Sequence, residues 1–159
     1  MDYLWSPWRY QYVAQQVPPK GCVFCLKMQE NRDEENLVLY RGLNNYVLLN
    51  LFPYTSGHLM IAPYAHIAQL SGADDATWME MMELTRKAEQ ALQKAYQPDG
   101  INLGMNLGKS AGAGIADHIN MHVLPRWHAD SNFLTVISET RVLPESLAET
   151  YRKLKPLFE

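Results

Sequence analysis

The sequence DHINMHVLPRW, residues 117–127, places polar side chains at every second position of a predicted β-strand. Alternate residues of a strand face the same side and lie about 6.6 Å apart along it. His118, Asn120 and His122 are therefore expected to share one face, while the apolar residues between them face the other side. Such a row of polar side chains opposite an apolar face indicates a functional site more than a structural one. Its middle member, however, is an asparagine.

Length and composition limit what the chain can be. With 159 residues, 47% of them hydrophobic, we expect a single compact domain spanning 1–159. A net charge of -3 gives no field that would attract a nucleic acid polymer, so an anionic ligand must be held by local groups. The start has no signal-peptide pattern and no long apolar run occurs, which predicts a cytoplasmic protein without membrane contact.

Hydrophobic periodicity and turn signals predict an α+β fold with an antiparallel sheet of about five strands. The expected strands are residues 37–40, 46–51, 58–62, 101–107 and 118–124, with a possible edge strand at 133–137. A short helix is expected at 25–31, a long helix at 74–96 and a C-terminal helix starting at Pro144. The methionines of the long helix could line a binding groove, but their helical spacing favours a place in the core.

Residues 1–20 combine three prolines with five aromatic side chains, which predicts an ordered arm without regular secondary structure. On an unpacked tail, so many exposed aromatic rings would promote aggregation. The arm either covers the chain's own core or packs on a partner subunit.

The two cysteines, Cys22 and Cys25, have a spacing that is common in metal and redox sites. Zinc in a closed site takes four thiolate or imidazole ligands. His66 and His118 lie at the ends of predicted strands, where they can complete such a set. The alternatives are a redox pair or two free thiols, but the βαβ pattern of a thioredoxin-like site is missing.

A loop of small residues precedes the histidine strand and contains Gly108, Gly112 and Gly114. Glycines let a backbone approach an anion closely, and successive amides form a concave donor site. The loop matches neither a Walker motif nor a dinucleotide fingerprint, and a flexible connection is the alternative. Its position next to the histidines favours phosphate binding.

Taken together, GHLMIAP with the following His66, the segment NLGMNLG, the small-residue loop and DHINMHVLPRW resemble the histidine triad (HIT) superfamily of nucleotide hydrolases and transferases. The segments LWSPWR, CVFC and PRW are similar to the bacterial diadenosine tetraphosphate phosphorylase and Fhit-like branch. The resemblance covers nearly the whole chain. The family's motif alternates three histidines with apolar residues, and Asn120 replaces the second.

The resemblance implies a mechanism in which the middle histidine attacks the α-phosphate and forms a nucleotidyl-histidine. A neutral imidazole has a lone pair for this attack. Asn120 can hydrogen-bond to phosphate but cannot form the adduct, because its amide nitrogen is conjugated. We therefore expect this chain to bind its nucleotide and to be inactive or nearly so.

Other roles follow from the resemblance by position. His122 would contact the phosphate and assist the leaving group, and His58 would support it from a neighbouring strand. Asn50 matches a ribose-binding position and Asn106 an asparagine near the scissile phosphate. The expected phosphate-binding amides belong to Gly112, Ala113, Gly114 and Ile115, and the zinc ligands to Cys22, Cys25, His66 and His118.

The main hypothesis is a zinc-containing protein that binds adenine nucleotides or dinucleoside polyphosphates, forms a homodimer or a tetramer, and is an inactivated variant of a working enzyme. A nucleotide-binding or sensing module and a zinc-stabilised interaction protein are the alternatives. The sequence leaves open whether water or phosphate resolves the intermediate, and whether the asparagine is natural.

Overall fold

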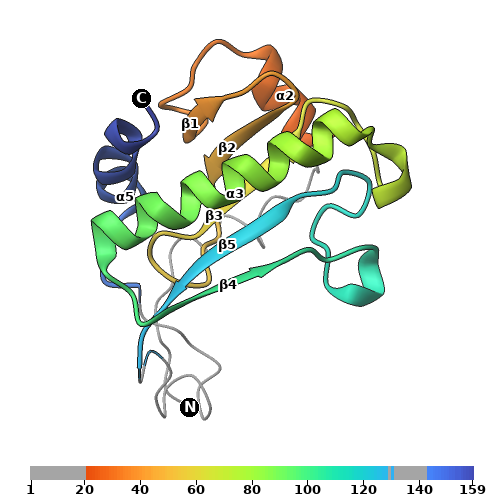
Figure 1. Cartoon of the computed structure of the whole chain (residues 1–159). Helices are drawn as coiled ribbons and strands as arrows, with labels where there is room; N and C mark the ends of the chain where they lie inside the picture. The colour runs from red at the N-terminus through yellow and green to blue at the C-terminus, as the bar shows by residue number, and fades with distance from the viewer. Residues whose placement is uncertain (1–20, 129, 131–142) are drawn as a thin grey trace, which may run out of the picture.

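The computed structural model describes residues 21–128, 130 and 143–159, which contain a five-stranded antiparallel sheet with helices on both faces (Figure 1). This confirms the α+β class. The strands lie in the order β1-β2-β3-β5-β4 and comprise β1 Val38–Arg41, β2 Asn45–Leu49, β3 Leu59–Pro63, β4 Gly100–Gly104 and β5 Met121–Arg126. The α-helices are α2 Val23–Gln29, α3 Asp75–Tyr96 and α5 Leu147–Leu154. The predicted arm, 1–20, and edge strand, 133–137, lie outside the described residues.

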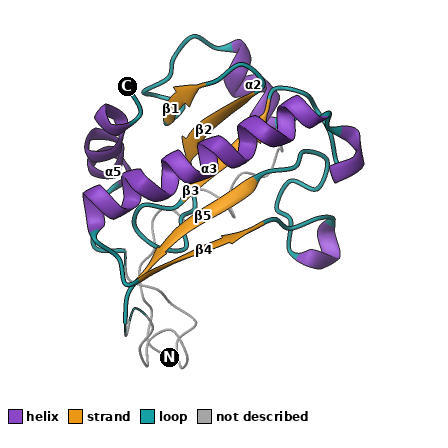
Figure 2. Ribbon diagram, in the orientation of Figure 1, coloured by secondary structure: helices purple, strands orange, loops and turns teal. Residues whose placement is uncertain are grey.

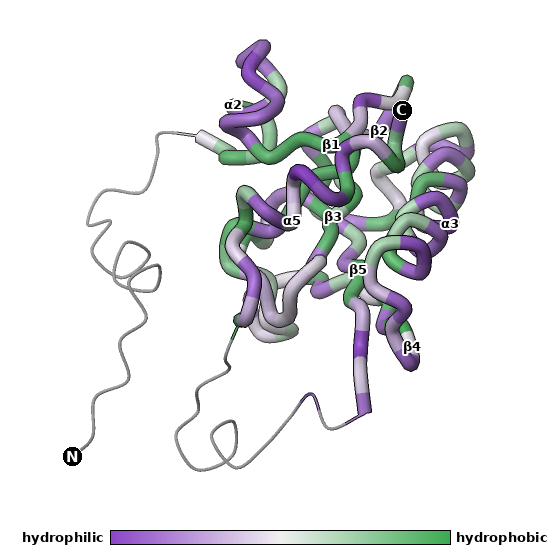
Figure 3. Tube along the Cα trace, turned by 90° about the vertical axis from the view of Figure 1, so that its left-hand side faces the viewer, coloured by the Kyte–Doolittle hydropathy of each residue, from purple (hydrophilic) through white to green (hydrophobic). Residues whose placement is uncertain are grey.

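The helices divide between the two faces of the sheet. Helix α3 runs along one face (Figure 2), and a view turned by 90° places α2 on the opposite side (Figure 3). Alternate residues of β3 serve two cores: Leu59 and Ile61 pack with α3 and α5, while Met60 and Ala62 pack with α2. Both faces of the central strands are therefore buried, which explains their nearly continuous apolar sequences.

The long helix agrees with its predicted bounds to within one residue. Asp74 caps it by accepting a hydrogen bond from the backbone N–H of Thr77 at 2.8 Å. Met81 is fully buried, but Met79 is 66% and Met82 53% exposed, so the expectation that the methionines belong to the core is right for Met81 and wrong for the other two. Among the described residues, no helix is long and apolar enough to cross a bilayer.

Several element ends differ from the prediction. Helix α2 begins at Val23, two residues early, with Cys22 as its N-cap residue. Helix α5 begins at Leu147, three residues after Pro144, because Ser146 accepts a hydrogen bond from the backbone N–H of Glu149 and thereby sets the start. Strand β4 ends at Gly104, three residues before the predicted end at 107.

Strand β5 differs most from its predicted bounds of 118–124. Strand β5 begins only at Met121, whose partner Ile61 is the last paired residue of β3 in this direction. The backbone N–H of Ile119 donates instead to the carbonyl of Ile67, in the loop after β3, at 2.8 Å. His118 and Asn120 therefore precede the strand, and the predicted single row of three side chains on one strand is wrong.

Candidate functional site

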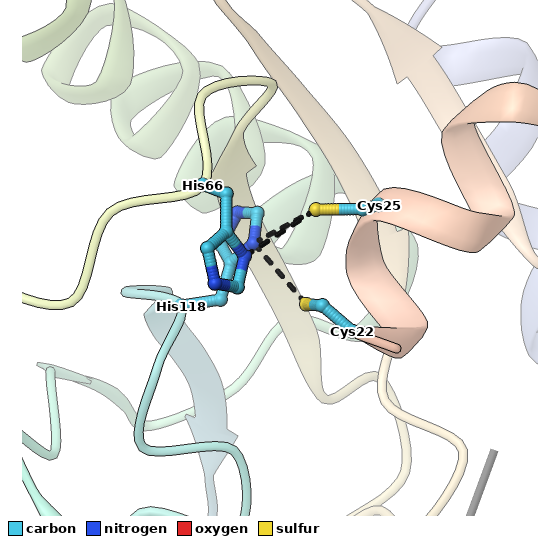
Figure 4. Close-up of side chains that lie close together, drawn as sticks. All are labelled: Cys22, Cys25, His66 and His118. Atoms are coloured by element: carbon cyan, nitrogen blue, oxygen red, sulfur yellow. Dashed lines mark hydrogen bonds between the residues drawn. The ribbon is translucent and has the colours of Figure 1, made fainter. Parts of the chain in front are cut away.

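Four side chains from three separate segments meet beside α2 (Figure 4). Cys22 and Cys25 come from the start of α2, His66 from the loop after β3, and His118 from the segment before β5. Their potential ligand atoms all lie within 4.8 Å of one another. The structure therefore assembles the sequence-predicted set into a possible metal site.

The hydrogen bonds of His118 fix which ring nitrogen faces the cysteines. Its Nε2 lies 2.8 Å from the carbonyl oxygen of Pro63, so Nε2 carries the proton and donates it. Nδ1 therefore has a lone pair, and it lies 3.3 Å from the Sγ of Cys22 and 3.6 Å from the Sγ of Cys25. Burial raises the pKa of the Cys25 thiol, and Cys22 adds to this effect, so a nearby cation would favour the Cys25 thiolate.

A second pair of histidines consists of His58 and of His122, which lies on β5. His58, just before β3, is 1% exposed, and its Nε2 is 2.8 Å from the Nδ1 of His122. The backbone N–H of Tyr54 donates to His58 Nδ1 at 3.1 Å. His58 Nδ1 is thus an acceptor. His58 must therefore carry its proton on Nε2, which donates a hydrogen bond to His122. Neutral His122 is consequently protonated on Nε2.

Asn50 supports this arrangement. Its Oδ1 accepts a hydrogen bond from the backbone N–H of Phe52 at 3.0 Å, which turns the amide nitrogen towards His58. That nitrogen is 3.2 Å from His58 Nδ1 and 3.5 Å from Nε2. The shorter contact is the hydrogen bond to Nδ1, so Asn50 and the backbone N–H of Tyr54 both donate to this nitrogen. The expectation that Asn50 binds ribose stays a prediction.

Both histidines of this pair are neutral at physiological pH. Burial first, and then the charge of His122, lower the pKa of His58 to about 3. Burial also lowers the pKa of His122. The pair is therefore uncharged, and its remaining donor is the Nε2 of His122.

A cavity of about 130 Å³ opens beside His122. This volume is below the range of pockets for whole small molecules but suits a phosphate-sized group. Its lining residues come from β4, β5 and two loops: Tyr54, Asn102, Leu103, Gly104, Asn106, His122 and Leu124. The predicted residues His122 and Asn106 thus share one cavity, which Asn120 and Asn50 do not line.

Asn120 lies between the two histidine groups. Its Nδ2 donates to the carbonyl oxygen of His118 at 3.2 Å. Its Oδ1 is buried and has no hydrogen-bond partner among the described residues. An unsatisfied buried acceptor of this kind is uncommon in a purely structural side chain.

The small-residue loop uses part of its own hydrogen-bonding capacity. Gly112 N–H donates to the carbonyl of Lys109 and Ala113 N–H to that of Gly108. Ile115 packs its side chain against the α2-side core. The loop lies close to Asn106, because a Cβ added at Gly112 would be 3.8 Å from the Asn106 amide nitrogen. Phosphate binding by residues 112–115 stays a prediction.

Sequence reasoning singled out only Asn106 and His122 among the seven lining residues, and three of the other five contribute features of their own. The Tyr54 ring stacks on His122, with ring centroids 6.0 Å apart and an interplanar angle of 21°. Asn102 and Gly104 lie on β4 directly opposite Leu124 and His122 of β5. Only the pairing of β4 with β5 gives these two residues a role, and no local pattern signals that pairing.

The fold and these two side-chain groups define a histidine triad protein, and sequence comparison agrees. Residues 31–129 match the HIT domain family model. The chain therefore belongs to the HIT family.

Known relatives narrow this class. The chain is 39% identical over 158 residues to the AP-4-A phosphorylase of Mycobacterium tuberculosis. The aligned region covers 95% of this chain and 81% of the relative. It is 28% identical over 115 residues to the asymmetrical bis(5'-nucleosyl)-tetraphosphatase of Schizosaccharomyces pombe, covering 72% of this chain and 63% of that protein.

Two solved structures have a similar fold. A Zn-bound histidine triad family protein from Mycobacterium smegmatis superimposes with a TM-score of 0.69 and 26% identity, covering 87% of this chain and 93% of the other. A hypothetical histidine triad nucleotide-binding protein from Sulfolobus tokodaii gives a TM-score of 0.66 and 27% identity over 86% and 89%.

Proposed function

We propose that this chain binds dinucleoside polyphosphates, such as diadenosine tetraphosphate, on the scaffold of a phosphorylase or hydrolase, with the α-phosphate at His122. The observation that carries the proposal is the His58 and His122 pair beside a phosphate-sized cavity. The protonated Nε2 of His122 is a neutral donor suited to a phosphate oxygen. The AP-4-A phosphorylase relative supports the substrate class.

Residue 120 decides whether this scaffold cleaves its ligand. A histidine there would attack the α-phosphorus through a ring nitrogen, forming an N–P bond while the P–O bond to the leaving nucleotide breaks. Asn120 has no lone pair for this attack, since its amide nitrogen is conjugated. His122 does not replace it, because the Tyr54 and His58 hydrogen bonds keep the His122 Nε2 protonated. We therefore propose that the chain binds the substrate without forming a nucleotidyl-histidine.

The proposal also includes zinc at Cys22, Cys25, His66 and His118. Tetrahedral bonds of about 2.3 Å to sulfur and about 2.0 Å to nitrogen place neighbouring ligand atoms about 3.5 Å apart. The sulfur-to-nitrogen distances of 3.3, 3.5 and 3.6 Å fit this geometry. A closed site with four protein ligands supplies structural stabilisation and leaves no open position for substrate.

A cytoplasmic homodimer, with a tetramer as the larger option, completes the proposal. Strand β4 is an edge of the described sheet, and its second half from Asn102 to Gly104 is exposed. An edge strand with exposed backbone groups can pair with a second copy.

The substitution Asn120→His tests the enzymatic part. It is expected to raise cleavage of diadenosine tetraphosphate by about 10⁴-fold, since loss of a nucleophile has an effect of that order. Asn120→Gln is the matched control, because it changes the side chain without supplying a nucleophile. Product identification with and without phosphate separates two activities: ADP that forms only with phosphate marks a phosphorylase.

An Asn120→His protein that stays inert toward every dinucleoside polyphosphate would contradict the enzymatic scaffold. If the unchanged chain nevertheless binds nucleotide, the alternative of a nucleotide-binding or sensing module is favoured. A chain without any nucleotide affinity would leave only the zinc-stabilised interaction protein.

A further inference from the structure

Asn102 occupies the middle of β4, on the same side of the sheet as His122. Directly opposed residues of antiparallel strands place their side chains on the same face. Asn102 is opposite Leu124, and Gly104 is opposite His122. The Asn102 side chain therefore faces the cavity that it lines. It lies two residues, or about 6.8 Å, along β4 from Gly104, the residue opposite His122.

Arg126 determines how the Asn102 amide is turned. The Nη1 of Arg126 donates to Asn102 Oδ1 at 2.8 Å. A guanidinium has donors only, so the amide must present its oxygen to Arg126 and its NH₂ group away from it. The NH₂ group of Asn102 is thereby left as a donor on the cavity side.

Arg126 is itself held in place. Asp130 accepts from its Nε at 2.5 Å and from its Nη2 at 2.9 Å, a bidentate arrangement. The carboxylate compensates the charge of the guanidinium. Arg126 therefore orients Asn102 more than it attracts an anion by itself.

Gly104 leaves room between Asn102 and His122. A Cβ added there would meet no atom within 4 Å, and Gly104 is not among the residues with positive φ. Neither packing nor backbone conformation within the described residues requires a glycine at this position. The open space opposite His122 is consistent with a ligand that runs along the strand.

We propose that Asn102 is a binding residue for the polyphosphate chain, donating its Arg126-oriented amide to a phosphate oxygen beyond the phosphate at His122. The inference rests on the proposed function, because that function places the first phosphate. It adds a selectivity: a nucleotide with a single phosphate does not extend to Asn102, whereas a dinucleoside polyphosphate does.

Titration calorimetry with Asn102→Asp and Asn102→Ala tests the inference. The aspartate can still accept from Arg126 but replaces the donor with an acceptor. Affinity for diadenosine tetraphosphate is expected to fall about tenfold or more for Asn102→Asp and several-fold for Asn102→Ala. Affinity for AMP is expected to change less than about threefold.

The matched control is Asn31→Asp, which makes the same charge change at an exposed position outside the cavity lining. It should alter neither affinity. In a second measurement, the side-chain NH₂ resonances of Asn102 should shift when the unchanged chain binds diadenosine tetraphosphate, and shift little with AMP.

Two results would overturn the inference. If both Asn102 variants bind diadenosine tetraphosphate as tightly as the unchanged chain, or lose AMP affinity equally, Asn102 does not contact the polyphosphate, while the proposed function stands. If the unchanged chain binds neither ligand, the proposed function fails and this inference fails with it.

Discussion

His118 and His122 are four positions apart in the chain, yet they belong to two different groups. At the cysteine cluster, His118 donates its Nε2 proton to the backbone carbonyl of Pro63 and turns a lone pair toward the thiols. At the cavity, His122 accepts on Nδ1 from His58 and keeps its Nε2 proton for the cavity. One imidazole therefore offers an acceptor suited to a cation, and the other offers a donor suited to an anion.

The difference arises from the backbone. A carbonyl, that of Pro63, sets the tautomer of His118 directly. A backbone N–H, that of Tyr54, sets the tautomer of His122 through the intervening ring of His58. A histidine side chain can thus suit a cation or an anion, depending on the group to which its other ring nitrogen is hydrogen-bonded.

The largest effect is expected at the cysteine cluster. Cys25→Ser removes one of the four proposed zinc ligands, so zinc content should fall. The free energy of unfolding should drop by about 4 kcal/mol, the stabilisation that a metal gives at a free concentration a thousandfold above its Kd. Elemental analysis and urea denaturation measure both quantities. His122→Asn is the control and should retain its zinc. A metal-free sample of the unchanged chain with undiminished stability would refute the zinc proposal.

The effect of pH at the cavity is smaller for each unit of pH. The pKa of His58 is about 3 in the folded chain and about 6.5 when unfolded, so the unfolded state takes up a proton first as pH falls. Stability should therefore decrease from about pH 6.5 downwards, by up to about 1.4 kcal/mol per pH unit from this group. His58→Gln should show a shallower decrease in urea denaturation at a series of pH values. Parallel curves for the two proteins would show that His58 titrates normally.

The smallest effect on stability is expected at Gly104. A methyl group there meets no atom within 4 Å, so Gly104→Ala should change the free energy of unfolding by less than about 0.5 kcal/mol. The methyl group would nevertheless enter the space opposite His122 and weaken binding of diadenosine tetraphosphate. Denaturation and calorimetry on the same sample separate the two effects. A large loss of stability would mean that the glycine serves the fold instead of the cavity.

The sequence predicted best what depends on local periodicity and on ligand chemistry. The helix expected at 74–96 is observed at Asp75–Tyr96, since its apolar spacing and its Asp74 cap act in the same direction. The cysteine pair and two histidines were expected to meet, and they do. Both predictions needed only short-range patterns or a known set of ligand types.

What the sequence could not predict depends on contacts between distant segments. The alternation at 118–122 predicted one strand, but hydrogen bonds to Ile67 and Pro63 remove His118 from the sheet. Asn102 acquires a role only when β4 pairs with β5 in one particular register. Neither feature has a local signal, because the partner lies tens of residues away.

The central claim is that the cavity beside His122 holds a phosphate of a bound dinucleoside polyphosphate, which Asn120 cannot cleave. The most direct test titrates the unchanged chain with diadenosine tetraphosphate in a calorimeter, with phosphate present, and then separates the nucleotides by chromatography. We predict saturable binding with the diadenosine tetraphosphate recovered intact. Absence of binding, or its conversion to mononucleotides over many turnovers, would contradict the claim.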